Sequence, residues 1–343
     1  MASSLPPDSS RTSRTLTSPR VAIIGAGLAG LTLARFLTET GFPVKVFDKG
    51  RGPAGRMSTR REDGGGTFDH GAQYFTARDP GFQRMVGTWV EQGFVAEWRG
   101  RFGSLEHGTV TPETEGPVRY VGVPGMNAVA RQLASGVDLR CGVRVEHVRR
   151  EAGAWALTSE SGEALGAFDV VVAAVPATQA VPLLSGAPEL AARAAGVRME
   201  PCWAVMASFD APVSLPLDGA FLHGSPLTWA ARDSSKPGRP PGERWVLHAS
   251  TGFSLEHLEE TPEAVAPRII EEFARVAGVE LRPREARAHR WRYARAEPAL
   301  TEGALFDERT GLGACGDWCA GSRVEGAFVS AVAVSRRITL MAR

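Results

Sequence analysis

The pattern of apolar positions predicts that ordered structure begins at Val21–Ile24, a short run without a polar residue that ends in glycine. Such a run is typical of a central parallel strand covered on both faces. Apolar residues then recur with helical spacing over residues 31–40, and Gly41 ends the predicted helix. Val44–Asp48 follows as a second strand with an acidic end. Strand, helix and strand within about thirty residues predict a βαβ unit.

Farther along, the pattern changes character twice. Residues 125–135 predict a helix, followed by strands at 143–149, 155–159 and 168–175. The middle of the chain alternates strand-like stretches at 203–209, 245–250 and 287–293 with one amphipathic helix at 262–276. Antiparallel strands rich in aromatic residues indicate a separate sheet that faces a substrate. A buried strand at 312–317 and a helix at 326–341 close the chain.

This order of elements predicts an α/β protein whose nucleotide-binding fold is interrupted and then completed by its last residues. We expect a Rossmann-type nucleotide-binding domain with an inserted α+β substrate domain built on a mixed sheet. The discontinuous nucleotide-binding domain is predicted at 21–75, 119–195 and 305–343, and the substrate domain at 76–118 and 196–304. Residues 1–20 are rich in Ser, Thr, Pro and Arg and predict a disordered tail.

Composition narrows the classes of function. The formal net charge of +1 over 343 residues gives no indication of a nucleic-acid partner. No apolar run reaches the ~20 residues of a membrane span, and the first 20 residues lack the apolar centre of a secretory signal. The four cysteines do not form two Cys-x-x-Cys pairs, so no metal site is expected. We predict a cytoplasmic protein with free thiols.

The first chemical motif is Gly25-Ala26-Gly27-Leu28-Ala29-Gly30. Gly25 permits a tight turn, Gly27 allows the backbone to approach a pyrophosphate, and Gly30 permits close packing of helix on strand. The helix N-terminus offers free N–H groups to phosphates. Since the motif follows a strand, opens a helix and precedes Asp48 by eighteen residues from Gly30, it predicts a dinucleotide site with Asp48 on the ribose hydroxyls.

Two further motifs point to FAD, because a dehydrogenase that binds only NAD needs neither. The loop at 51–60 contains Arg56, whose planar donor fork suits a pyrophosphate. Asp317, at a strand end, can bind ribityl hydroxyls, and the helix that begins near Gly326 directs N–H groups at an electron-rich ring edge. The predicted cofactor-binding residues from the three motifs are Gly25, Gly27, Leu28, Ala29, Gly30, Asp48, Lys49, Arg51, Gly55, Arg56, Met57, Asp317, Val324, Gly326 and Ala327.

Several longer stretches resemble bacterial renalase-like flavoproteins, within the wider flavin amine oxidase superfamily. They are residues 47–60, 69–76, 245–249, 289–295 and 315–319, and the similarity extends over the chain from Val21 onward. The resemblance implies a glutathione reductase/p-hydroxybenzoate hydroxylase-like FAD domain that holds FAD non-covalently. It also implies oxidation of aberrant dihydro isomers of NAD(P), the 2- or 6-dihydro forms, to NAD(P)⁺, with O₂ reduced to hydrogen peroxide.

Carried over to this sequence, the resemblance implies FAD contacts from Gly27, Gly30, Asp48, Arg56, Val145, Asp317, Gly326 and Ala327. The contact of Val145 is expected through its backbone, near the adenine. Position 70 departs from the family, which more often has an apolar residue where this chain has His70.

A dihydropyridine is already a hydride donor, so the protein needs only to place the donor carbon near the flavin and exclude water. We therefore expect no catalytic triad and no obligatory acid/base pair. The expected partners are a dihydronicotinamide nucleotide and O₂, with Arg232 as a further candidate for its phosphates. The predicted substrate-side residues are Gln73, Tyr74, His248, Trp291 and Arg292.

Two alternatives stay open from the sequence. An amine oxidase or another FAD dehydrogenase of the same superfamily would favour an aromatic cage and often a lysine near the flavin N5. Lysine is scarce here, and of Lys45, Lys49 and Lys236 only Lys236 falls in the predicted substrate region. The other alternative is a nucleotide-binding redox sensor without turnover, against which the large aromatic-rich insertion argues.

Overall fold

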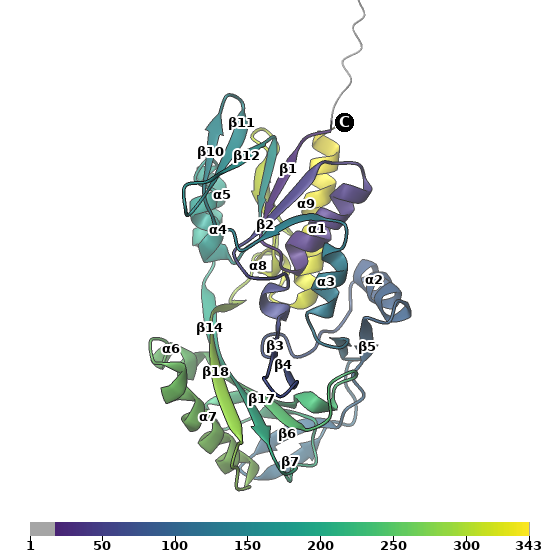
Figure 1. Cartoon of the computed structure of the whole chain (residues 1–343), viewed down its shortest axis with the longest axis vertical. Coiled ribbons are helices and arrows are strands. Elements are labelled where there is room, and N and C mark those ends of the chain that lie inside the picture. Colours follow the sequence, from purple (N-terminus) through teal and green to yellow (C-terminus); the bar gives the residue numbers. More distant parts are fainter. Residues whose placement is uncertain (1–17, 343) are drawn as a thin grey trace, which may run out of the picture.

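The computed structural model describes residues 18–342, so most of the predicted tail at 1–20 lies outside the described residues. A six-stranded sheet forms the core of the upper half of the molecule in Figure 1. In spatial order its strands are β19 (Leu305–Asp307), β20 (Leu312–Ala314), β13 (Val170–Ala173), β1 (Val21–Ile24), β2 (Val44–Asp48) and β9 (Asp138–Cys141). All neighbours pair in parallel except β19, which runs antiparallel to β20.

The unbroken apolar sequence of β1 is explained by its position between β2 and β13, where all four of its side chains are buried. Successive side chains of a strand point to opposite faces. Val21 and Ile23 accordingly pack into one apolar layer, and Ala22 and Ile24 into the other. The prediction of a central strand covered on both faces is confirmed.

The two layers over this sheet are built from distant parts of the chain (Figure 1). One face carries the helices α1 (Leu28–Glu39), α3 (Ala128–Ala134) and α9 (Val324–Met341). The other face carries β10 (Val145–Glu151), β11 (Ala154–Ser159), β12 (Ala164–Phe168), α4 (Ala177–Leu183) and α5 (Pro188–Ala195). Because α9 packs against α1, the last helix completes the fold that the first begins.

A seven-stranded mixed sheet forms the lower half of the view (Figure 1). In spatial order its strands are β18 (Glu285–Ala296), β14 (Met199–Phe209), β17 (Glu243–Ala249), β16 (Leu227–Arg232), β15 (Gly219–Leu222), β6 (Phe102–Glu106) and β7 (Thr109–Pro112). The sheet is mixed because β15 and β6 are parallel while the other pairs are antiparallel.

One face of this second sheet is closed by helices, and the other faces the first half of the molecule. α7 (Pro262–Ala277) packs Ile269 and Phe273 onto Trp203 and Leu247 of the outer face, and α6 (Thr251–Glu256) lies beside β14. The remaining elements are η1 (Gly55–Met57), β3 (Thr59–Arg61), β4 (Thr67–Asp69), α2 (Pro80–Glu91), β5 (Val95–Glu97), β8 (Tyr120–Gly122), η2 (Asp233–Ser235) and α8 (Asp317–Ala320).

The predicted α/β class, with a Rossmann-type domain and a mixed sheet, is confirmed. The first helix begins at Leu28 rather than at residue 31, since the turn around Gly27 already has the geometry of a helix start. The sequence analysis missed α4, α5, β6, β15 and β16, which have at most eight residues each. It also missed α2, although Phe82, Val86 and Trp89 recur there with helical spacing. Among residues 18–342, no helix combines the length and the apolar composition needed to cross a bilayer.

Candidate active site

A cavity of about 1880 Å³ lies between the carboxyl edge of the first sheet and the inner face of the second. Its lining includes Gly25 after β1, Asp48 at the end of β2 and Ala174 after β13. Open α/β sheets bind ligands at this edge. Pockets for drug-sized ligands measure roughly 300–1,000 Å³, so this cavity has room for a large cofactor together with a substrate.

The glycine-rich turn forms one end of the cavity. Gly25 has φ 115°, and a Cβ there would lie against the carbonyl of Ala174. A Cβ on Gly30 would overlap the Gly25 carbonyl oxygen, so this glycine serves the packing of helix on strand. Gly25, Gly27, Leu28 and Ala29 line the cavity, whereas Gly30 lies behind them. Each glycine thus occupies the place that the motif predicts.

Asp48 anchors the end of β2 over this turn. Its Oδ2 accepts from the Ala26 amide at 2.6 Å, and its Oδ1 accepts from the Gly50 amide at 2.6 Å. Lys49 donates from Nζ to Gln179 at 3.1 Å. Burial lowers the pKa of Lys49, the charge of Arg144 lowers it further, and Asp48 opposes both.

The other predicted residues near this end divide into lining and non-lining positions. Val145, at the start of β10, is buried and lines the cavity, as do Gly55 and Met57. Arg51 is exposed and does not line the cavity, although its neighbours Gly50 and Gly52 do.

The second and third motifs meet through an ion pair between residues far apart in sequence. Arg56 Nη2 lies 2.5 Å from Asp317 Oδ1, and Arg56 Nη1 lies 3.0 Å from Asp317 Oδ2. Arg56 Nη1 also donates to the Ala294 carbonyl of β18 at 2.9 Å. Both side chains line the cavity, and only 8% of the Asp317 side chain is exposed. The tertiary fold thus brings the two motifs to one point.

The N-terminus of α9 supplies a further part of the wall. Its capping residue, Arg323, makes no side-chain hydrogen bond to the first turn, so backbone N–H donors there are available. Val324 and Ala327 line the cavity, while Gly326 packs against the Gly321 carbonyl and does not. Gly326 therefore serves close packing at this helix start.

The substrate-facing end contains Gln73 and His248, which lie close together. Gln73 is 5% exposed and donates from Nε2 to the carbonyls of Asp69 and of Gly71, the latter at 3.2 Å. Its Nε2 lies 3.5 Å from Nε2 of His248. Burial lowers the pKa of His248 to about 4, the charge of Lys236 lowers it too, and a hydrogen bond to the His70 backbone opposes both. His248 is therefore neutral at pH 7.

Aromatic side chains continue the wall of the cavity beside Gln73 and His248. Tyr74 lies with its ring centroid 5.4 Å from that of Trp229, and Trp229 makes an edge contact with Phe221 at 4.8 Å. All three line the cavity, and 41% of Phe221 is exposed. Trp229 and Phe221 were missed from the sequence, since nothing in its pattern distinguishes them from core aromatics.

Trp291 belongs to a second aromatic group. Its Nε1 donates to the His70 carbonyl at 2.9 Å, and its ring stacks on His70 at 5.1 Å. Burial is the main cause that lowers the pKa of His70 to about 3 and that of His289 to about 4, and the charge of Arg60 lowers both. Trp291 and His289 line the cavity, whereas His70 is buried behind them.

Two family comparisons agree with this geometry. Residues 23–89 match the NAD(P)-binding Rossmann-like domain. Residues 100–339 match the flavin-containing amine oxidoreductases, over more than half of the chain. The chain belongs to the flavin-containing amine oxidoreductase family.

Solved structures support the fold of this family member. A protein assigned as a protoporphyrinogen oxidase, from Exiguobacterium sp. 255-15, superposes with a TM-score of 0.77 at 13% identity, covering 94% of this chain and 99% of that one. Putrescine oxidase bound to putrescine superposes with a TM-score of 0.71 at 14% identity and the same coverage. At these identities the likeness concerns the fold.

Curated relatives match only over short stretches. A ζ-carotene-forming phytoene desaturase of Myxococcus xanthus is 44% identical over 45 residues, 13% of this chain and 9% of that protein. A lysine-specific histone demethylase 1 homologue of Arabidopsis thaliana is 49% identical over 47 residues, 14% of this chain and 6% of that protein. The chain thus spans under a tenth of the length of these two relatives.

The cofactor of this amine oxidoreductase family member is FAD, and its residues fit that group. No side chain caps the first turn of α1 and no acidic residue lies in that turn, which leaves N–H donors for a pyrophosphate. Nothing lies within 4 Å of the position that a Cβ on Gly27 would take, so the approach is open. The described residues contain no group of three or more His, Cys, Asp and Glu side chains suited to a metal ion.

Two arginines that the sequence analysis assigned to the substrate pair with carboxylates of the protein instead. Arg292 reaches the rim of the cavity, but both of its terminal nitrogens lie 2.7 Å from the carboxylate of Glu259. Arg232 contacts Asp218 and Glu243 and does not line the cavity, so the suggestion that it holds substrate phosphates is wrong. Alternation along β18 places Arg292 on the α7 side of the sheet, opposite His289.

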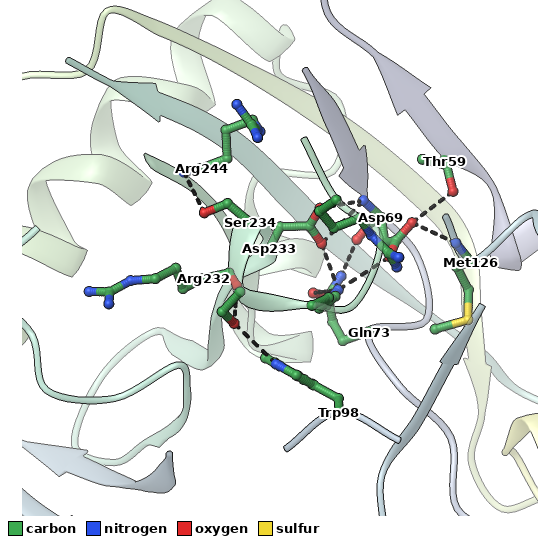
Figure 2. A network of polar contacts seen from close by, with 12 residues as sticks. Thr59, Asp69, Gln73, Trp98, Met126, Arg232, Asp233, Ser234 and Arg244 are labelled. Atoms are coloured by element: carbon green, nitrogen blue, oxygen red, sulfur yellow. Dashed lines mark hydrogen bonds and ion pairs between the residues drawn. The ribbon is translucent and has the colours of Figure 1, made fainter. Parts of the chain in front are cut away.

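Sequence reasoning missed a buried ionic cluster next to Gln73, shown in Figure 2. It joins Asp69, Asp233, Lys236 and Arg239, whose side chains are all fully buried. From the sequence, Lys236 is distinguished only as the one lysine in the predicted substrate region. Its pairing could not be read from the sequence, because Asp69 is 167 residues away.

Proposed function

We propose that the protein oxidises dihydro isomers of NAD(P), the 2- or 6-dihydro forms, to NAD(P)⁺. The substrate gives up a hydride, which carries two electrons and one proton. O₂ takes up these two electrons and this proton, together with one further proton, and becomes H₂O₂. FAD supplies the two-electron acceptor between them. The task of the chain is to hold the dihydropyridine in place and to exclude water.

The observation that carries this proposal is the charge of the cavity wall. Arg60, Arg78 and Arg323 line the cavity, and none of them pairs with a carboxylate among residues 18–342. Unpaired guanidiniums favour an anionic ligand, since each can offer a planar donor fork to a phosphate. A dinucleotide substrate carries such phosphates, whereas a protonated amine would be repelled.

By contrast, the carboxylates that line the cavity are already hydrogen-bonded within the protein or lie at the rim. Glu200 pairs with Arg295 at 2.8 Å, and Glu325 accepts hydrogen bonds from the backbone amides of Arg78 and Asp79. Asp48 is held by two amides, and the exposed Glu146 and Glu263 lie at the rim. The interior of the cavity therefore offers no free carboxylate, in the part of the chain that the structure describes, to bind an ammonium group.

Lysine placement also supports a dihydropyridine over an amine. Lys45 lies in β2, and Lys49 lies at the Asp48 end of the cavity. Lys236 is enclosed in the ionic cluster with a fully buried side chain and does not line the cavity. A dihydropyridine needs no base to release its hydride, and the neutral Gln73 and His248 suit the orientation of a carboxamide.

The test is anaerobic mixing of the FAD-loaded protein with separated 2-, 4- and 6-dihydro isomers of NAD and NADP, with putrescine and other primary amines as comparators. We expect rapid bleaching of the flavin absorbance with a 2- or 6-dihydro isomer, and recovery with H₂O₂ on admission of air. Arg78→Met should raise KM for the productive isomer while kcat changes little, because it removes uniform binding. Exposed Arg140, paired with Glu163 away from the cavity, provides the matched control Arg140→Met.

An amine oxidase is the second candidate, favoured by membership of the family and by the likeness of fold to putrescine oxidase. Bleaching by an amine and by none of the dihydropyridines would establish this candidate and end the leading proposal. A flavin that no compound of either class reduces would leave the redox sensor.

A further inference from the structure

The inner face of the second sheet carries a row of ring side chains that crosses three neighbouring strands. Strand pairing places His248 of β17 beside Trp229 of β16, and Trp229 beside Phe221 of β15. Residues paired in register project from the same face of a sheet, and all three side chains line the cavity. Since neighbouring strands lie about 4.7–4.9 Å apart, the row extends for about 10 Å from His248 to Phe221.

Phe221 is the last and most exposed member of this row. Its exposed fraction is 41%, against 6% for Trp229. Of the exposed large apolar side chains in the part of the chain that the structure describes, Phe221 is the one that lines the cavity. A scattered apolar residue on an outer surface needs no explanation. One inside a ligand cavity offers apolar contact area to the ligand.

The residues behind Phe221 hold the row in place. Trp229 contacts Phe221 in a T-shaped arrangement at 65°, and such a contact covers at most one face of the Phe221 ring. Trp229 also packs against Tyr74, and the guanidinium carbon of Arg119 lies 5.1 Å from the Tyr74 ring centroid. A Cβ on Gly219 would lie 2.8 Å from the Trp229 ring, so Trp229 has little room to move. The open face of Phe221 is therefore presented by a preorganised wall.

The chemistry of the cavity narrows what can occupy that face. Arg60, Arg78 and Arg323 line it without a carboxylate partner among residues 18–342, which favours a ligand with phosphates. The proposed function assigns the nicotinamide ring of that ligand to Gln73 and His248. A dinucleotide has a second planar base, joined to the first through two riboses and a pyrophosphate. That base needs a surface of its own, and aromatic side chains stack on every nucleobase because each has a π-face.

We propose that Phe221, supported by Trp229, forms a stacking subsite for the adenine of the dinucleotide substrate. This inference rests on the proposed function and deepens it, since it makes a dihydro dinucleotide a better substrate than the corresponding dihydro mononucleotide. Phe221 is then a specificity-determining residue, which contacts the substrate away from the reacting carbon. An interaction with a remote group acts equally before and during hydride transfer, so it should affect KM and leave kcat unchanged.

The test compares the 2- and 6-dihydro isomers of NAD with those of nicotinamide mononucleotide, which lacks the adenine. Each compound is mixed anaerobically with the FAD-loaded protein, and the rate of flavin bleaching is followed against its concentration. The half-saturating concentration measures binding, and the maximal rate measures hydride transfer. Removal of a stacked aromatic weakens the binding of a base by about 5- to 150-fold. We expect Phe221→Ala to raise the half-saturating concentration of the dinucleotide by a factor in this range and to leave its maximal rate unchanged.

The mononucleotide serves as an internal control for the same variant. A general disturbance of the cavity would weaken binding of the mononucleotide as well, whereas loss of stacking should leave its half-saturating concentration unchanged. Phe221→Trp should retain tight binding of the dinucleotide, and Phe221→Leu should recover only part of it, because leucine keeps apolar bulk but has no π-face. Leu255→Ala is the matched control variant, since Leu255 is 56% exposed on α6 and does not line the cavity.

Failure of this subsite and failure of the proposed function give different results. If a dihydropyridine bleaches the flavin but Phe221→Ala changes the binding of dinucleotide and mononucleotide by the same factor, the subsite is wrong and the proposed function stands. Equal half-saturating concentrations of the two compounds with the wild-type protein would likewise overturn the subsite alone. If no isomer of either compound bleaches the flavin, the proposed function and the subsite fail together.

Discussion

The contact between Arg56 and Asp317 leads to the sharpest prediction about cofactor binding. We consider Arg56→Met, which keeps the length of the side chain and removes its charge and its donors. In the structure Arg56 makes two hydrogen bonds to Asp317 and one to the Ala294 carbonyl. Since 30% of the Arg56 side chain is exposed at the cavity, part of its donor fork can meet a pyrophosphate.

The magnitude follows from the charge-assisted character of these bonds. A hydrogen bond to a charged group contributes roughly 1.5–3 kcal/mol, and about 1.4 kcal/mol corresponds to a tenfold change in affinity. Loss of one such bond to FAD should weaken its binding by about 10- to 150-fold. Arg56→Lys should recover part of this, because an ammonium keeps the charge but lacks the fork.

The assay is titration of the apoprotein with FAD, followed by quenching of flavin fluorescence. Arg61→Met is the matched control, since Arg61 lies in the adjacent β3, is exposed and does not line the cavity. Asp317→Asn, alone and combined with Arg56→Met, measures the coupling of the pair. An Arg56→Met variant that binds FAD within a factor of about two of wild type would refute the role assigned to Arg56.

Three further predictions concern packing, the ionic cluster and pH. Gly30→Ala should yield protein with little bound FAD, measured as flavin per chain, because its Cβ would overlap the Gly25 carbonyl and displace α1 from β1. Asp69→Asn should lower the free energy of unfolding by about 3–5 kcal/mol, because it leaves the buried Arg239 underpaired. With an unfolding entropy of ~2.1 cal/mol/K per residue, this lowers the melting temperature by about 4–7 °C. A smaller fall in melting temperature than that of the exposed Glu163→Gln would count against a stabilising role of the cluster. His289 has a folded pKa of about 4, below its unfolded 6.5. Its effect on stability is therefore absent above pH 6.5 and grows unfavourable as pH falls toward 4, so His289→Asn should flatten the decline of melting temperature over that interval.

The local sequence determined the βαβ unit at the N-terminus. An unbroken apolar run must be covered on both faces, and a glycine-rich turn before a helix leaves backbone donors without a side-chain cap. Both conclusions depend on neighbouring residues alone, which is why Val21–Ile24 and Val44–Asp48 were predicted with the bounds that the structure shows. The same reasoning placed FAD, because each of the three motifs is a short segment with its own geometry.

Tertiary structure decided which charged residues face the cavity and which are occupied elsewhere. Arg56 meets Asp317 across 261 positions, and Lys236 meets Asp69 across 167. Arg292, which the sequence placed at the substrate, is held by Glu259. Periodicity reports whether a side chain faces inward, but the partner of a charge depends on which strands become neighbours in the folded sheets. That choice is made by the packing of the whole chain, and no local pattern in the sequence contains it.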